Sequence, residues 1–271
     1  MARTVFFISD GTAITAETLG HSLLTQFDLG DFAQHRLPFV GTLERAERAA
    51  QAVTRAMEDD GERPIVFHTV IEPKHAKLLE ATGACVVDLF GQLATPLEEE
   101  FGVSRERHVG RAHGLTNVDS YDLRMEATNY ALSHDDGANT DYADADLVMI
   151  GVSRSGKTPT CLYLALQFGV SAANYPLTED DLDGADLPKS LRSAHGRLFG
   201  LTIGPVRLAQ IREARRPGSR YASLARCRSE VGDAEMIYQR RNIPHLDATH
   251  MSVEEICTKV LQKLKLTRRL Y

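Results

Sequence analysis

The stretch Leu147–Thr158 has the sequence LVMIGVSRSGKT and contains every fixed position of the phosphate-binding loop pattern G-x-x-x-x-G-K-[ST]. The apolar letters LVMI before the first glycine are typical of a strand that is covered on both faces of a parallel sheet. After the pattern, Leu162–Phe168 is rich in apolar residues and ends at Gly169, a common helix stop. These flanks predict a strand, a phosphate-binding loop and a helix in succession, rather than a glycine-rich turn without a ligand.

The spacing within the loop follows from the chemistry of phosphate binding. Gly151 and Gly156 let the backbone curl so that successive N–H groups converge on phosphate oxygens, and the new helix adds its positive end. Lys157 brings a mobile charge to the outermost phosphates and is a predicted catalytic residue, while the Thr158 hydroxyl is placed to bind Mg²⁺. The predicted nucleotide-binding residues are Gly151, Val152, Ser153, Arg154, Ser155, Gly156, Lys157 and Thr158.

The composition is that of a globular protein with a sizeable core. The chain has 271 residues, 43% hydrophobic and 25% charged, which argues against disorder and fibrous classes. Its formal charge of −6 argues against general nucleic-acid binding. No apolar run approaches the ~20 residues of a membrane span, and the four cysteines are scattered without a metal-binding pattern. We therefore expect a soluble cytoplasmic protein with no nucleic-acid or membrane partner.

Short apolar stretches alternate with helical patterns along the chain, which is typical of right-handed βαβ units and parallel sheets. The expected strands are 4–8, 35–40, 64–68, 85–89, 145–150, 170–174, 198–203 and 244–246. The expected helices after the phosphate loop include 205–214, 230–241 and 253–266. We predict an α/β protein with an N-terminal parallel α/β domain at 1–104, a connecting helix and acidic loop at 105–143, and a P-loop kinase-like α/β domain at 144–271.

Two candidate catalytic acids precede the loop strand. The sequence His134–Gly137 (HDDG) follows an expected helix at 118–134 and could supply a general base or carboxylates for Mg²⁺. Solvated acids after a helix end are the alternative interpretation. At ~3.3 Å per strand residue, Asp144 lies ~20 Å from the loop, so it is not expected to be catalytic. Asp135 and Asp136 lie outside the strand and can fold back, and we predict them as catalytic residues.

Two further segments allow both a functional and a structural interpretation. Ser9–Thr12 follows the first strand at the edge where parallel sheets bind ligands, and it is either a phosphate or partner site or a capped tight turn. The arginine-rich segment from Arg207 to Arg228 could bind phosphates or an acidic partner, or it could be a solvated helical face. Nucleic-acid binding is the least favoured option there, because aromatic residues are few.

Several motifs together resemble a known family. They are GVSRSGKTPTCLYLA at 151–165, FFISDGTAITAETLGHSLLTQF at 6–27, HDDG at 134–137 and NYPL at 174–177. In this combination they resemble the bacterial phosphoenolpyruvate synthase regulatory proteins, which are relatives of the plant pyruvate,phosphate dikinase regulatory proteins. The resemblance runs from the N-terminus to the final helix.

The resemblance implies a bifunctional serine/threonine kinase and pyrophosphorylase. Such an enzyme phosphorylates a threonine of phosphoenolpyruvate synthase with ADP, releases AMP and inactivates its target. It removes the same phosphate with inorganic phosphate, releases pyrophosphate and restores activity. ADP would bind with Mg²⁺ at Gly151–Thr158, and the oligomeric state stays open, with a homodimer as one option. Two alternatives remain: an ATP-dependent P-loop kinase of small molecules, and a nucleotide-sensing regulator without catalysis.

Overall fold

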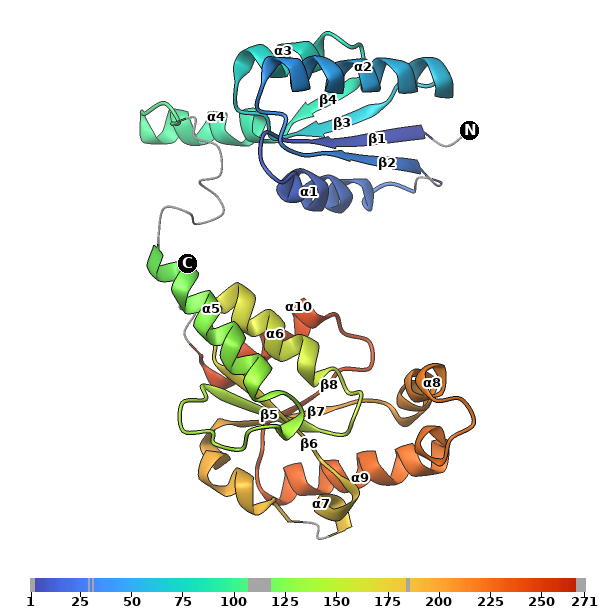
Figure 1. The fold of residues 1–271 in the computed structure, drawn as a ribbon, viewed down its shortest axis with the longest axis vertical. Helices are drawn as coiled ribbons and strands as arrows, with labels where there is room; N and C mark the ends of the chain where they lie inside the picture. Colours follow the sequence, from blue (N-terminus) through green and yellow to red (C-terminus); the bar gives the residue numbers. More distant parts are fainter. Residues whose placement is uncertain (1–2, 29, 31, 107–117, 184–185, 267–271) are drawn as a thin grey trace. The chain divides into compact units, whose positions relative to one another are not determined.

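The computed structural model describes residues 3–28, 30, 32–106, 118–183 and 186–266. The chain divides into two compact units, Met1–His113 and Gly114–Tyr271 (Figure 1). Each unit contains one four-stranded sheet in which all strand pairs are parallel, so the predicted α/β class is confirmed. Residues 107–117, which make up part of the predicted connecting segment, lie outside the described residues.

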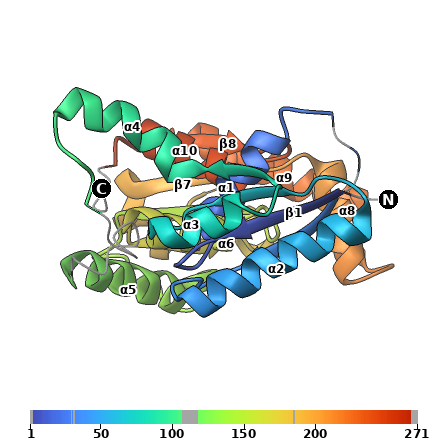
Figure 2. The same cartoon turned by 90° about the horizontal axis from the view of Figure 1, so that it is seen from above.

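The first unit has the strand order β2-β1-β3-β4. Its elements are β1 (Arg3–Ile8), α1 (Ile14–Leu24), β2 (Phe32–Leu37), α2 (Leu43–Asp60), β3 (Ile65–His68), α3 (Pro73–Glu80), β4 (Cys85–Asp88) and α4 (Leu89–Phe101). On one face of the sheet Phe7 and Phe67 pack with Ala16 of α1, and on the other Phe6 and Val66 pack with α2 and α3. Helices α2 and α3 lie side by side (Figure 2).

The second unit has the strand order β6-β5-β7-β8. Its elements are α5 (Val118–Ser133), β5 (Leu147–Gly151), α6 (Lys157–Phe168), β6 (Ala172–Pro176), α7 (Glu179–Asp183), β7 (Leu198–Thr202), α8 (Pro205–Arg215), α9 (Leu224–Arg240), β8 (His245–Asp247) and α10 (Val253–Leu264). Leu164 of α6 and Val260 of α10 bury one face of the sheet, and Leu208 of α8 and Val231 of α9 bury the other. Helix α5 packs beside α6 (Figure 1), with small residues such as Ala131 at the contact.

Three of the expected elements are displaced. The strand expected at 170–174 is Ala172–Pro176. The second strand is Phe32–Leu37 rather than 35–40, because it pairs in register with β1 and the chain then turns through Phe39, whose φ is 59°. Helix α9 begins at Leu224 rather than at residue 230. The side chain of Ser223 caps it by accepting a hydrogen bond from the N–H of Arg226 at 3.4 Å.

The strand order determines where a ligand is expected. In each unit the first strand lies between the second and the third. The connection from the first strand therefore leads to one side of the sheet, and the connection from the third strand leads to the other. In open parallel sheets the crevice at this point, beyond the carboxyl ends of the strands, is the usual ligand site. In the second unit this position is taken by the loop that follows β5. None of the helices formed by the described residues is long and apolar enough to cross a membrane.

Candidate functional site

The predicted phosphate-binding loop connects β5 to α6 at the carboxyl edge of the second sheet. Every residue of β5 is buried, so the loop starts from a fixed point. A side chain at Gly151 would collide with the carbonyl oxygen of Leu201, and Gly156 has a φ of 99°, which favours glycine. Arg154 adopts a φ of 76°, an uncommon conformation for a residue with a side chain and one that is frequent at binding loops.

Lys157 is buried at the start of α6, with only 4% of its surface exposed. Its ammonium group donates a hydrogen bond to the carbonyl oxygen of Val152 at 3.0 Å, so it closes the loop on itself. Burial lowers the pKa of Lys157 to about 8, although the negative charges of Asp136 and Asp135 oppose this shift. The loop therefore holds a partly desolvated cation whose charged form an incoming phosphate would stabilise.

The lowered pKa of Lys157 predicts a pH-dependent gain in stability for Lys157→Met. A pKa lowered from 10.5 to about 8 corresponds to roughly 3 kcal/mol of unfavourable free energy at neutral pH. Between these values the unfolded chain binds more protons, so the wild type gains stability as the pH rises through this range. We expect the methionine variant to be the more stable at neutral pH, and its advantage to shrink from about pH 8 upwards. Urea unfolding of both proteins across this range measures the gap, and a gap independent of pH would contradict the prediction.

Asp135 lies directly against the loop. Its Oδ1 accepts a hydrogen bond from the Thr158 hydroxyl at 2.8 Å and another from the side-chain amide of Asn174. The Oδ1 of Asn174 in turn accepts from the backbone N–H of Asp136 at 3.1 Å. Asn174 is 1% exposed and lies in β6, so the 3₁₀ turn Asp135–Gly137 is fixed to the neighbouring strand. The structure thus brings Asp135 and Thr158 together, and it does not leave Asp135 as a freely solvated acid.

Asp136 differs from Asp135 in its exposure. Its backbone has a φ of 48°, and its side chain is exposed to solvent. Of the nearby charges that favour the protonated form of Lys157, that of Asp136 has the largest effect on its pKa. The carboxylate of Asp136 therefore acts on the same site. Asp136 is therefore the acid of this turn that a large substrate can reach.

His134 has a structural role in the same turn. Its ring stacks on Tyr130 with 3.9 Å between the ring centroids. Nδ1 lies 2.9 Å from the carbonyl oxygen of Tyr130, and Nε2 lies 3.0 Å from that of Asp141. Because both ring nitrogens face backbone oxygens, His134 is not available as a general base, and the functional interpretation of HDDG narrows to its two acids.

Arg212 of α8 contacts the loop from the interior of the unit, and it is not among the predicted site residues. It is fully buried, and one of its amino groups donates hydrogen bonds to the Ser153 carbonyl oxygen at 3.0 Å and to Glu230 at 2.7 Å. Its spacing from Leu208 on the buried face of α8 was the only sequence signal, because the arginines around it suggested a solvated surface. Arg226, from the same arginine-rich segment, pairs with Glu230 and with Glu179 of α7. This segment is therefore divided between exposed arginines and buried or half-buried ones.

The Ser9–Thr12 turn of the first unit is tied to the neighbouring strand. The Ser9 hydroxyl accepts from the N–H of Gly11 at 3.0 Å and from the Thr69 hydroxyl at 2.8 Å. The carboxylate of Asp10 accepts from the N–H of Ile71 at 2.8 Å. These contacts use the polar groups that a ligand would need, and they favour the structural interpretation of the turn.

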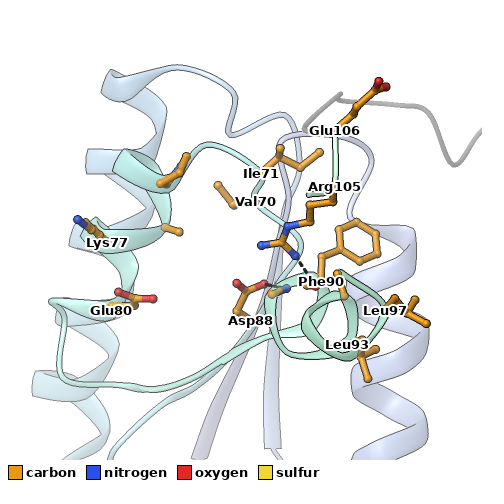
Figure 3. Close-up of a pocket in the computed structure, with 14 residues that line it drawn as sticks. Val70, Ile71, Lys77, Glu80, Asp88, Phe90, Leu93, Leu97, Arg105 and Glu106 are labelled. Atoms are coloured by element: carbon orange, nitrogen blue, oxygen red, sulfur yellow. Dashed lines mark hydrogen bonds between the residues drawn. The ribbon is translucent and has the colours of Figure 1, made fainter. Parts of the chain in front are cut away.

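A cavity of about 520 Å³ lies in the first unit, between α3 and α4. Figure 3 shows Lys77 and Glu80 on its α3 side and Phe90 and Leu93 on its α4 side. The first turn of α4 faces this cavity, but the carboxylate of Asp88 caps that turn by accepting from the N–H of Gly91 at 2.7 Å. The lining is mainly apolar, with Lys77 and Arg105 as its basic side chains, and the end of α4 is capped, so the cavity differs from the phosphate-binding loop predicted in the second unit.

The sequence matches the family model described as kinase/pyrophosphorylase over residues 5–261. The chain belongs to this family. A relative from Alcanivorax borkumensis is 50% identical over the full length of both chains, and one from Aromatoleum aromaticum is 52% identical over 99% of this chain and 98% of its own. A Pseudomonas putida relative is 48% identical over 99% of each chain. All three are provisionally named phosphoenolpyruvate synthase regulatory protein.

The site of this kinase/pyrophosphorylase family member has the groups that a phosphate chain and Mg²⁺ require. Ser155 Oγ is buried and has no hydrogen-bond partner among the described residues, so it can serve a phosphate oxygen. Thr158 donates its proton to Asp135, which leaves a lone pair on its own oxygen for a cation. Within the described ranges no cluster of three or more His, Cys, Asp or Glu side chains forms a metal site.

Proposed function

We propose that the protein is a cytoplasmic regulator of phosphoenolpyruvate synthase that transfers the β-phosphoryl group of ADP to a threonine of that enzyme and removes it with inorganic phosphate. The observation that carries this proposal is the hydrogen bond from Thr158 to Asp135 beside the buried Lys157, in a chain of the kinase/pyrophosphorylase family. The names of the relatives support phosphoenolpyruvate synthase as the target.

In the forward direction the threonine oxygen forms a bond to the β-phosphorus of ADP, and the bond from that phosphorus to the bridging oxygen breaks to release AMP. The exposed carboxylate of Asp136 accepts the threonine proton. Asp135, which is held by Thr158 and Asn174, keeps the metal-binding oxygens in place. Mg²⁺ would supply positive charge at the transferred group, and Lys157 adds its own as the charge there develops.

In the reverse direction an oxygen of inorganic phosphate forms a bond to the phosphorus of the phosphothreonine. The bond between that phosphorus and the threonine oxygen breaks, and pyrophosphate is the product. Asp136 returns a proton to the threonine oxygen. The same loop can serve both directions. ADP in the forward reaction and pyrophosphate in the reverse reaction place similar negative charges over its N–H groups.

ADP suits this loop as a donor because its terminal phosphate is already the β-phosphate. Phosphate-binding loops hold the β-phosphate close to the lysine, so the group to be transferred would meet Lys157 directly. The acceptor must then approach the loop closely. The exposed position of Asp136 at the edge of the site is consistent with an acceptor residue on another protein.

The test is a transfer assay with purified phosphoenolpyruvate synthase and Mg²⁺, run in parallel with β-labelled ADP and with γ-labelled ATP. We expect label on the target from ADP alone, and its release as pyrophosphate after unlabelled phosphate is added. Transfer from ATP alone would show an ordinary P-loop kinase instead. If neither donor labels the target although ADP binds, a nucleotide-sensing regulator without catalysis is the better description.

A further inference from the structure

Arg212 is a charged side chain with 0% exposure, and it lies behind the phosphate loop rather than at its surface. Burying a guanidinium group is unfavourable unless it is paired with an opposite charge and hydrogen-bonded. The two amino groups of Arg212 have three oxygen acceptors: the carbonyl oxygen of Ser153 at 3.0 Å, that of Tyr221 at 3.1 Å and the carboxylate of Glu230 at 2.7 Å. Its Nε has no hydrogen-bond partner among the described residues. The ring of Tyr221 covers the guanidinium carbon at 4.1 Å. These contacts fix the guanidinium, so Arg212 can hold the backbone that it contacts in position.

The group that Arg212 holds is a peptide of the loop itself. In a trans peptide the carbonyl oxygen and the N–H of the next residue point in opposite directions. Because Arg212 keeps the oxygen of Ser153 on its own side, the N–H of Arg154 must point away from the guanidinium. The hydroxyl of Tyr221, 2.9 Å from the Ser153 hydroxyl, holds the side chain of the same residue. These contacts from outside the loop hold the peptide that precedes Arg154, the residue with the unusual φ of 76°.

We propose that Arg212 is a positioning residue of the phosphate loop, which fixes the Ser153–Arg154 peptide so that the Arg154 N–H is directed at the bound phosphate chain before the nucleotide arrives. Preformed donors bind more tightly because no free energy is spent on ordering them. The inference rests on the proposed nucleotide site, although it concerns binding and not the later transfer of phosphate.

The geometry also requires arginine specifically. Arg212 donates to Tyr221 from one amino group and to Ser153 and Glu230 from the other. An ammonium also has three donors, but they all start from one nitrogen and cannot reproduce this planar, two-pronged arrangement. Glu230 neutralises the buried charge and accepts a further hydrogen bond from Arg226 at 2.6 Å. Arg226 also forms an ion pair with Glu179 of α7. The network that contacts the loop therefore reaches the segment that follows β6.

The test compares Arg212→Lys with Arg228→Lys, because Arg228 lies on the exposed surface of α9. ADP affinity is measured by calorimetry on each folded variant, with thermal unfolding in parallel. We expect Arg212→Lys to weaken ADP binding at least tenfold and Arg228→Lys to change it less than twofold. If Arg212→Lys lowers the unfolding temperature but binds ADP like the wild type, its role is only structural and the proposal is overturned.

A second pair of variants covers the case in which Arg212→Lys does not fold. Tyr221→Leu removes the ring that covers the guanidinium, and Tyr221→Phe keeps the ring and removes only the hydroxyl. We expect Tyr221→Leu to weaken ADP binding several-fold more than Tyr221→Phe does, and equal affinities would overturn the proposal. Wild-type ADP binding without any transfer to phosphoenolpyruvate synthase would refute the proposed function but leave this comparison valid.

Discussion

Lys157→Ala is expected to reduce phosphate transfer from ADP by about 10²- to 10³-fold, as the loss of a fixed positive charge at a transferred group typically does. The ammonium of Lys157 is buried at the start of α6 and donates to the carbonyl oxygen of Val152 at 3.0 Å. In the proposed reaction a phosphate oxygen takes the place of that partner. Alanine has no charged group that could replace this ammonium. The measurement is the initial rate of label transfer from ADP to phosphoenolpyruvate synthase at saturating ADP.

The control for this experiment is Lys259→Ala, which removes an exposed lysine from α10. It should leave the transfer rate within about twofold of the wild type, in line with the small effects of surface substitutions. A loss of less than tenfold in Lys157→Ala would mean that the charge is not used in the transfer step. The alanine variant no longer buries a desolvated cation, so we do not expect it to be less stable than the wild type. A slower reaction would therefore not be explained by unfolding.

The loop could be predicted from the sequence because its residues form one short contiguous motif with fixed glycine positions. Gly151 is needed where the backbone passes the carbonyl oxygen of Leu201, and Gly156 where φ is 99°. The apolar residues before the loop and the helical pattern after it predict the strand β5 and the helix α6 that the structure contains. The alternation of such pairs likewise predicts parallel sheets, since a crossover helix must return the chain to the same edge.

The supports of the site could not be predicted, because they depend on which segments meet in space. Asn174 is a polar residue in a buried strand, and its amide reaches Asp135 because the turn Asp135–Gly137 packs directly against β6. Arg212 belongs to an arginine-rich segment that resembles a solvated surface, yet the packing of α8 buries it behind Ser153. In both cases a polar side chain at a buried position was the available signal, and its partner lies far away in the sequence.

The Asp135→Asn variant tests the other half of the site. The replacement keeps the size and an oxygen that can accept from Thr158, but it removes the negative charge next to that hydroxyl. We expect transfer from ADP to fall by about 10²-fold and the Mg²⁺ concentration needed for half-maximal rate to rise, because a neutral amide is a weaker partner for a hard cation. The measurement is the transfer rate as a function of Mg²⁺ concentration.

The matched variant Asp136→Asn separates the roles of the two acids. If Asp136 is the base, this variant loses transfer with little change in its Mg²⁺ requirement, because its exposed carboxylate lies outside the Thr158–Asp135 hydrogen bond. Asp135→Asn should instead show its defect most strongly at low Mg²⁺ and recover in part when Mg²⁺ is raised. Identical Mg²⁺ dependence in the two variants would contradict this division, since it would mean that the charge of Asp135 serves the proton transfer and not the metal.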